Sequence, residues 1–465
     1  MRGIRMLLGA AASCVALSIA PAASAETLAD ALIAAYQNSN LMEQNRALLR
    51  ATDEDVAVAL SALRPVISFV AQSSYANVRS YRSLGFGAAT KDNDESLTSS
   101  IGLTAEMTLY DFGRNALALE AAKETVLATR EALVDLEQNV LLGAVQAYVD
   151  VRLAEDIVAL RQSNNRLVGQ ELQASQDRFD VGEVTRTDVA LAEAGLAEAR
   201  AGLSQAQGDL TIAREAYKAS TGVYPVNLAP LPPAPATARS LEAARAVALR
   251  THPDIRQAQR NVTIAELNVA RGKAAMRPSL TGSLSLSLNE AGNETSRAGV
   301  SLSQTLYAGG QLSATYRRAL ALRDAQRASL QQAGLVVAQN VGVAWSNVAV
   351  ASSSITAGDE RVRASRTAFD GVREEATLGA RTTLDVLDAE QELLDAQFSL
   401  VSAQASRHVG TYQVLFTMGL LTVDHLRLGI PTYDAAAYYN AVKNAPATSP
   451  QGKKLDRILK SIGGN

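Results

Sequence analysis

The chain has 465 residues, of which 47% are hydrophobic and 20% charged, a composition that excludes an intrinsically disordered protein. Its 44 Lys and Arg against 47 Asp and Glu give a formal charge of -3, so a basic surface for nucleic acid is not expected. One Cys and three His exclude Cys-based zinc sites, iron-sulfur clusters and a disulfide framework. Only oxygen-ligand metal sites stay open, and no cofactor is expected.

The N-terminus has the pattern of a secretory signal peptide. Arg2 and Arg5 precede an apolar stretch, and small residues then lead to an expected cleavage site after Ala25. Residues 1–25 are therefore predicted to be a signal peptide. Cys14 follows Ala-Ala-Ser and leaves lipidation open as an alternative, although cleavage there would shorten the apolar region. An exported chain whose mature part has no cysteine fits the envelope of a Gram-negative bacterium.

The mature chain contains an internal duplication. Arg64-Pro65 returns 213 positions later as Arg277-Pro278, whereas Leu109-Tyr110 returns 197 positions later as Leu306-Tyr307, an offset that then holds. A proline-rich stretch separates the two copies. The predicted divisions are a first repeat over 26–224, a linker over 225–240, a second repeat over 241–419 and a C-terminal segment over 420–465. This last segment is expected to pack around the outside of the helices.

Each repeat begins with a predicted helical segment, over 28–63 and 241–276, and continues with two predicted strands. Leu284, Leu286 and Leu288 alternate with serines in the second repeat, and residues 100–109 alternate in the same way. Strands of about nine or ten residues suit a tilted membrane span, and a Ser/Thr face suits a water-filled lumen. Polar turns are predicted over 79–95 and 289–295 and would face the outside.

Four strands in a chain are too few to close a barrel. An open sheet in a bilayer would leave the hydrogen-bonding groups of its edges in hydrocarbon. The membrane interpretation therefore requires an oligomer, and three copies with twelve strands are the natural closed solution.

Helices of unusual length follow the strands. Residues 114–178 and 311–377 contain no proline, and each stretch would reach roughly 100 Å as a helix. Each turns back at a glycine, Gly182 or Gly379, into a second helix over 188–220 or 383–418, which makes a long helical hairpin. The uncharged window over 328–358 contains several Gln, Asn and Ser residues, and it is predicted to be a packed helix rather than a membrane span.

The returning helix of the second hairpin combines an apolar seam, spaced as in a coiled coil, with a line of carboxylates. The carboxylates have the same 3-4-3 spacing and no basic residue on their stripe: Asp385, Asp388, Glu392 and Asp395. A solvated face and an acidic lining of a lumen are both compatible with this pattern. We favour the lining, because like charges at this spacing are mildly destabilising.

Three motifs carry a family resemblance. LYAGG at 306–310, RFDVG at 178–182 and GARTTLDVLDA at 379–389, together with the duplicated order, resemble the TolC family of outer-membrane efflux proteins. The resemblance covers nearly all of the mature chain. It implies a membrane α+β fold, in which a homotrimeric 12-stranded β-barrel with four strands per chain is continued by a long α-helical barrel of coiled-coil hairpins.

The same resemblance implies location and partners. Such a channel lies in the outer membrane, extends into the periplasm, and engages a periplasmic adaptor protein with an inner-membrane ABC transporter or RND pump. It exports drugs or, in type I secretion, proteins. The choice between these cargoes stays open, because a passive tunnel has no substrate pocket.

The resemblance also implies a gate at the periplasmic entrance. Arg381 matches one side of the bonds that close the family's tunnel, and Thr187 and Asp188 match the other side. Asp385 and Asp388 match an acidic entrance ring, whose carboxylates are expected to attract cations and to raise one another's pKa. The family's gating tyrosine is Ala376 here, which removes one of the expected constraints on closure.

An enzyme is not expected. His252, His408 and His425 lie in different segments without metal-ligand spacing, and the sequence has no hydrolase, metalloprotease or phosphate-loop motif. A structural coiled-coil or adhesin-like envelope protein is the alternative from another class. It would explain the long helices and the export signal but not the four amphipathic strands.

Overall fold

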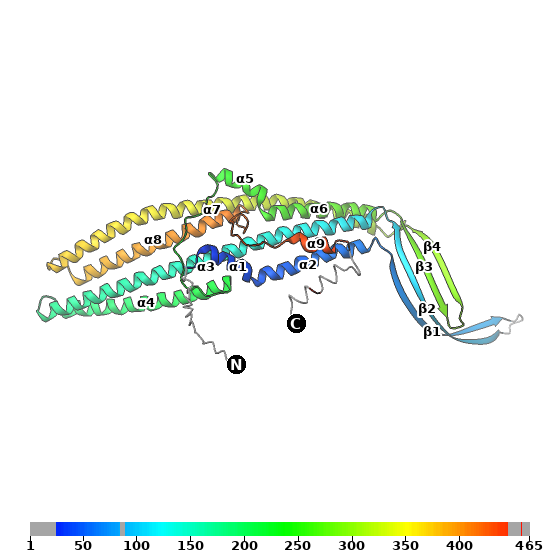
Figure 1. Ribbon diagram of the computed structural model, residues 1–465, viewed down its shortest axis with the longest axis horizontal. Coiled ribbons are helices and arrows are strands. Elements are labelled where there is room, and N and C mark those ends of the chain that lie inside the picture. Colours follow the sequence, from blue (N-terminus) through cyan, green and yellow to red (C-terminus); the bar gives the residue numbers. More distant parts are fainter. Residues whose placement is uncertain (1–24, 84–88, 445–456, 458–465) are drawn as a thin grey trace, which may run out of the picture.

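The computed structural model describes residues 25–83, 89–444 and 457. The chain is strongly elongated, with a four-stranded sheet at one end and two helical hairpins reaching the other end (Figure 1). The predicted signal peptide, apart from Ala25, lies outside the described residues, as do most residues after 444.

The two repeats have the same order of elements. The first consists of α1 (Leu28–Asn38), α2 (Asn40–Ser61), β1 (Val66–Ser83), β2 (Ala89–Tyr110), α3 (Arg114–Asp180) and α4 (Arg186–Thr221). The second consists of α5 (Leu241–Thr251), α6 (Pro253–Ala274), β3 (Ser279–Asn289), β4 (Glu294–Ser303), α7 (Gln311–Thr377) and α8 (Thr383–Thr417), and α9 (Ala435–Val442) follows. Helices α5 and α6 begin 213 positions after α1 and α2, and α7 and α8 begin 197 positions after α3 and α4. Both offsets found in the sequence therefore reappear as equivalent helix starts.

The prediction of one helix before each pair of strands was wrong, because each segment is broken near its middle. In the first repeat Ser39 adopts an extended conformation and its hydroxyl accepts a hydrogen bond from Met42 N (3.3 Å), so a new helix begins there. In the second repeat the residue before Pro253 is forced out of the helical region, and His252 Nδ1 accepts from Asp254 N (3.2 Å). The break directs α1 and α5 away from the long axis of the hairpins (Figure 1).

The four strands form one antiparallel sheet in the order β1-β2-β3-β4. Cross-strand partners align the alternating apolar residues on one face: Phe69 pairs with Leu103, and Leu103 with Leu286. All three side chains are exposed in a single chain. An exposed apolar face with a hydroxyl-rich opposite face matches the predicted lipid-facing and lumen-facing sides.

The lengths of the strands differ from the prediction in the first repeat only. Strands β3 and β4 have 11 and 10 residues, close to the expected span, and turn between Asn289 and Glu294 as predicted. Strands β1 and β2 have 18 and 22 residues and pair as far as Ser83 and Ala89, so the turn predicted over 79–95 was wrong. The polar and charged residues there continue as a two-stranded ribbon beyond the end of β3 and β4 (Figure 1).

The long helices match the predicted ranges closely. Helices α3 and α7 have 67 residues each, roughly 100 Å at 1.5 Å per residue. An apolar window of α7 is long enough to cross a membrane by length and composition, and the helix as a whole packs along α8 and α6. That the window itself is packed rather than membrane-spanning stays a prediction. Only 17% of this window is buried within one chain.

The largest apolar core lies where α1, α3, α4, α8 and the linker meet, about halfway along the molecule. Tyr148 is fully buried there, and its hydroxyl lies 3.0 Å from Glu26 O and 2.7 Å from Ala229 O. Farther toward the sheet, α9 packs on α2, where Tyr438 donates a hydrogen bond to Glu54 Oε1 (2.8 Å). The linker and the segment after the second repeat are thus attached to the helices by specific contacts.

Candidate functional site at the hairpin tips

The two hairpin tips lie together at the end of the molecule opposite the sheet (Figure 1). Gly182 and Gly379 have φ values of 82° and 76°, a left-handed conformation that a glycine adopts without strain. The side chains of Val181 and Leu378, which precede these glycines, are 71% and 78% exposed. The two tips thus present an exposed apolar side chain at an equivalent position of the repeat.

A capping box closes the start of the returning helix at both tips. Asp188 Oδ2 accepts from Thr185 N (2.9 Å) and Thr185 Oγ1 (2.7 Å), and Asp385 Oδ2 accepts from Thr382 N and Thr382 Oγ1 (both 2.9 Å). The side-chain hydrogen bond from Thr185 lowers the pKa of Asp188, and the backbone hydrogen bond from Thr382 lowers the pKa of Asp385. Both carboxylates are therefore ionised at neutral pH. For Asp385 the shift within one chain is opposite to the upward shift expected from an acidic ring.

Arg381 does not contact Thr187 or Asp188 within one chain. Its Nε donates to Glu375 Oε2 at 2.8 Å, and this hydrogen bond raises the pKa of the guanidinium. The side chain of Arg381 is half exposed, and Thr187 is exposed on the other tip. The predicted pairing would therefore have to form between neighbouring chains. Within one chain, Glu375 is a competing partner for Arg381.

The acidic stripe of α8 is partly neutralised by the neighbouring helix. Arg361 of α7 contacts Glu392 Oε1 through Nε (3.2 Å) and Nη2 (2.7 Å). The stripe itself has no basic residue, but a basic residue of the neighbouring helix pairs with Glu392. Asp388 is exposed and Asp385 half-buried close to the tip, which leaves these two as the predicted entrance carboxylates.

Ala376, which stands at the place of the expected tyrosine, is buried near the tip. Its carbonyl oxygen accepts a hydrogen bond from Arg178 Nη1 of α3 at 3.4 Å. A contact between the two hairpins therefore exists at this position, although it is made by the backbone.

Sequence reasoning missed a row of polar contacts between the two hairpins. Arg373 Nε of α7 lies 3.2 Å from Glu171 Oε1 of α3, and Ser175 Oγ lies 3.4 Å from Thr383 Oγ1. The contact farthest from the tips is between Asn164 Nδ2 and Glu390 Oε1, at 3.0 Å. A signal was present, since Glu390 occupies an inward position between Val386 and Leu393 in the helical period.

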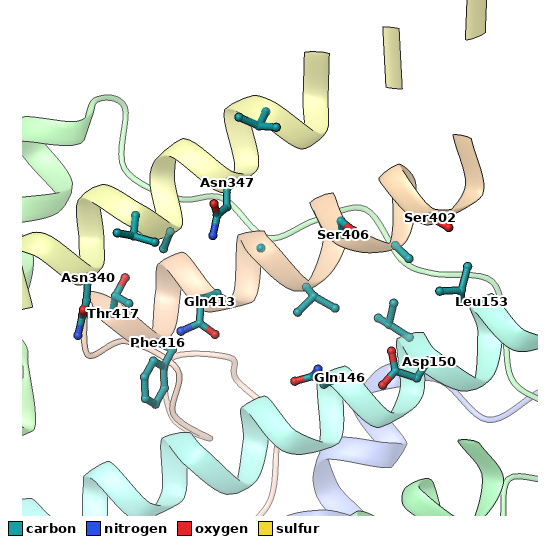
Figure 2. Close-up of a pocket in the computed structure, with 17 residues that line it drawn as sticks. Gln146, Asp150, Leu153, Asn340, Asn347, Ser402, Ser406, Gln413, Phe416 and Thr417 are labelled. Carbon is teal, nitrogen blue, oxygen red and sulfur yellow. The ribbon is translucent and has the colours of Figure 1, made fainter. Parts of the chain in front are cut away.

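A cavity of about 850 Å³ lies between α3, α7 and α8, on the side of the polar contacts that faces away from the tips (Figure 2). Amide and hydroxyl groups dominate its polar lining, among them Gln146, Asn340, Asn347, Ser406 and Gln413. Among the described lining residues Asp150 is the one titratable group, and burial raises its pKa.

Comparisons with known proteins agree with this architecture. The family model of the outer membrane efflux proteins matches residues 32–223 and 245–417, which is one match for each repeat. The chain is 36% identical to outer membrane efflux protein BepC of Brucella suis biovar 1, over 91% of this chain and 92% of BepC. It is 25% identical to outer membrane protein TolC of Salmonella enteritidis, over 92% and 94% of the two chains.

A crystal structure of CusC, described as forming a transmembrane channel, superposes with a TM-score of 0.75 at 18% identity, covering 85% of this chain and 92% of CusC. The resemblance found in the sequence is confirmed, as are the outer-membrane location, the channel function and the fold class of a trimeric, internally duplicated barrel and tunnel. The family and the solved neighbours are channel proteins rather than enzymes. The chain belongs to the outer membrane efflux protein family.

Proposed function

We propose that this channel is the outer-membrane component of a periplasm-spanning export complex, and that it opens and closes at the hairpin tips. One observation carries the proposal: an open sheet of membrane-spanning length continues directly into helices of about 100 Å, which end in two equivalent tips. Within the described residues, the outer edges of β1 and β4 have no strand partner, and the apolar window of α7 is largely uncovered. Both features support burial against neighbouring copies of the chain.

A periplasmic adaptor protein is the proposed partner at the tips, joining the channel to an inner-membrane ABC transporter or RND pump. The exposed side chains of Val181 and Leu378 support this, because apolar groups at the end of a long rod are suited to a protein contact. Their equivalence under the duplication would offer the adaptor two similar contact points per chain, six in a trimer.

The gate is proposed to close when Arg381 of one chain meets Thr187 and Asp188 of a neighbouring hairpin. Asp188 is ionised, so an ion pair with a guanidinium is chemically suitable. Glu375, the intrachain partner of Arg381, would compete with Asp188 for the guanidinium.

Cargo is proposed to pass without a dedicated binding site. The amide-rich lining of the cavity between α3, α7 and α8 supports this, because it offers neither a charged cluster nor an aromatic cage. Both drugs and secreted proteins stay open as cargo, and the inner-membrane transporter would choose between them.

Ion conductance of the purified protein in planar lipid bilayers tests this function. We expect small discrete steps for the wild type and a several-fold larger conductance for Arg381→Ala, since that change removes the closing pair. Val184→Ala is the matched control, because Val184 occupies the equivalent position of the other tip. An unchanged conductance of Arg381→Ala in stable, inserted trimers would refute the gate, and silence of all three proteins would refute the channel.

A further inference from the structure

The row of polar contacts between the hairpins, here called the polar seam, consists of Arg178 with Ala376 O, Ser175 with Thr383, Glu171 with Arg373, and Asn164 with Glu390. It joins α3 of the first hairpin to α7 and α8 of the second over the last part of both hairpins. Any movement that separates the hairpins near the tips must break it. The proposed gate residues Thr187, Asp188 and Arg381 are not part of this seam.

Glu390 carries the more deeply buried of the two carboxyl groups in the polar seam, since it is 3% exposed and Glu171 is 8% exposed. Its Oε1 accepts the hydrogen bond from Asn164, but its Oε2 is buried and has no hydrogen-bond partner within the described part of the chain. Val386 and Leu393 lie one turn away on either side and belong to an apolar cluster. An ionised carboxylate would be costly in this place, whereas a neutral carboxyl group would avoid the cost of burying a charge.

The charged groups that face Glu390 do not compensate its charge. Glu171 of α3 is a like charge, and Arg373 of α7, the nearby cation, is already paired with Glu171. Burial is the largest influence and raises the pKa of Glu390 to about 7; Glu171 acts in the same direction, whereas Asn164 and Arg373 oppose the shift. Glu390 therefore changes its charge near neutral pH, unlike Asp188 and Asp385 at the tips.

We propose that Glu390 is a positioning residue for channel opening: as a neutral acid it holds the two hairpins of a chain together, and as a carboxylate it favours their separation. The neutral acid keeps the hydrogen bond from Asn164 without burying a charge. The ionised side chain gains water when the hairpins part, which repays the loss of that bond. This inference rests on the proposed gating at the tips, and it assigns the proton as a regulator of the gate.

The direction of the pH dependence follows from proton binding. The closed state holds the proton up to about pH 7, whereas a solvated Glu390 in an opened state would release it near its ordinary pKa of 4.5. The closed state thus binds more protons between these values, so lowering the pH favours closure and raising it favours opening. From about pH 5.5 to about pH 8, the ratio of open to closed channel should rise roughly tenfold or more per chain.

Conductance across this pH range, recorded for wild type and Glu390→Gln, tests the proposal. Glutamine resembles the neutral acid, so we expect Glu390→Gln to conduct poorly at every pH and to lose the rise seen in the wild type. Glu198→Gln on α4 is the matched control, because Glu198 is exposed, and it should keep the wild-type profile. A pH profile of Glu390→Gln that equals the wild-type profile would overturn the proposal.

A second variant covers the case in which Glu390→Gln does not fold. Cysteines at Ser175 and Thr383, whose hydroxyls lie 3.4 Å apart, would link the hairpins across the polar seam. The chain's single cysteine, Cys14, belongs to the predicted signal peptide and would not interfere. The oxidised pair should conduct independently of pH, and reduction should restore the rise; an oxidised channel that keeps the wild-type rise would contradict the role of the seam.

Hydrogen exchange separates a failure of this inference from a failure of the channel. Corrected for intrinsic rates, exchange of the backbone amides in α3 and α8 beside the seam should accelerate from pH 5.5 to pH 8 in the wild type but not in Glu390→Gln. This result is expected even if the trimers do not conduct, in which case only the proposed function fails. Equal protection at both pH values would overturn the role of Glu390.

Discussion

The two repeats differ in their β-hairpins but hardly in their helical hairpins. Helices α3 and α7 have 67 residues each, and α4 and α8 have 36 and 35, whereas β1 and β2 have 18 and 22 residues against 11 and 10 for β3 and β4. The helical hairpins must run side by side and meet at the polar seam, so a change of length in one would displace its tip from the other. The ribbon formed by β1 and β2 continues beyond the shared sheet and contacts neither β3 nor β4 there, so its length is free to vary.

The two repeats should differ most when each β-hairpin is shortened by the same number of cross-strand pairs. Deleting residues 283–286 and 296–299, four paired rows, leaves seven and six residues in β3 and β4, which is too short for a span of about nine to eleven. We expect no membrane-inserted trimers, measured by heat-resistant migration in detergent gels. Deleting the paired residues 78–81 and 91–94 of β1 and β2 also removes four rows and keeps the alternation of faces. This second variant should form trimers normally; loss of its trimers would show that the ribbon is part of the barrel.

The hairpin tips of the two repeats differ in charge, because the second repeat has Asp388 where the first has Leu191. Asp385→Asn combined with Asp388→Asn should lower the ratio of cation to anion permeability several-fold, since the entrance loses two charges per chain. Asparagine is chosen because its amide oxygen can still accept the capping hydrogen bond from Thr382. Reversal potentials in a salt gradient give the ratio, and Leu191→Asn serves as the control that leaves it unchanged. If the double variant does not shift the reversal potential, the stripe is an ordinary solvated face.

The smallest expected effect concerns the equivalent aromatic positions Tyr148 and Trp345. Tyr148 is fully buried and its hydroxyl contacts the backbone of both Glu26 and Ala229, whereas Trp345 is partly buried beside a smaller apolar cluster. Tyr148→Phe should lower the free energy of unfolding by about 1 kcal/mol, because the part-buried carbonyl of Ala229 loses the hydrogen bond from the hydroxyl, whereas Glu26 O keeps its bond from Ala229 N (2.8 Å). Denaturant unfolding of the solubilised trimer measures this loss. Equal stability of Tyr148→Phe and wild type would mean that the linker is held by its other contacts alone.

Much of the fold was predictable because it depends on residues close together in the chain. Proline-free periodic stretches predicted α3 and α7, Gly182 and Gly379 marked the tips, and the constant offset of 197 related the two hairpins. The family motif also pointed to Arg381, Asp385 and Asp388, and the capping role of Asp385 is a local interaction across three residues. The roles proposed for these residues at the gate stay predictions, since they concern contacts between chains.

The errors arose where local signals resembled something else. Residues 79–95 combine charged and Gly-rich segments that are typical of a turn, yet cross-strand pairing carries β1 and β2 through most of them. The sequence did not indicate the helix break at Ser39, because serine also occurs inside helices. Serine caps a helix only where its backbone is extended, as that of Ser39 is.

The sequence by itself determined the repeat, the alternation of the strands, the extent of the long helices and the tips, because periodicity and capping act over a few residues. Only the tertiary structure decided that Arg361 neutralises Glu392, that Arg381 contacts Glu375, and that Glu390 is buried against Asn164. Asn164 and Glu390 are 226 positions apart, and no local rule reports which residue will face which across two packed hairpins. Burial in that contact, rather than the type of residue, is what moves the pKa of Glu390 to about 7 while those of Asp188 and Asp385 fall.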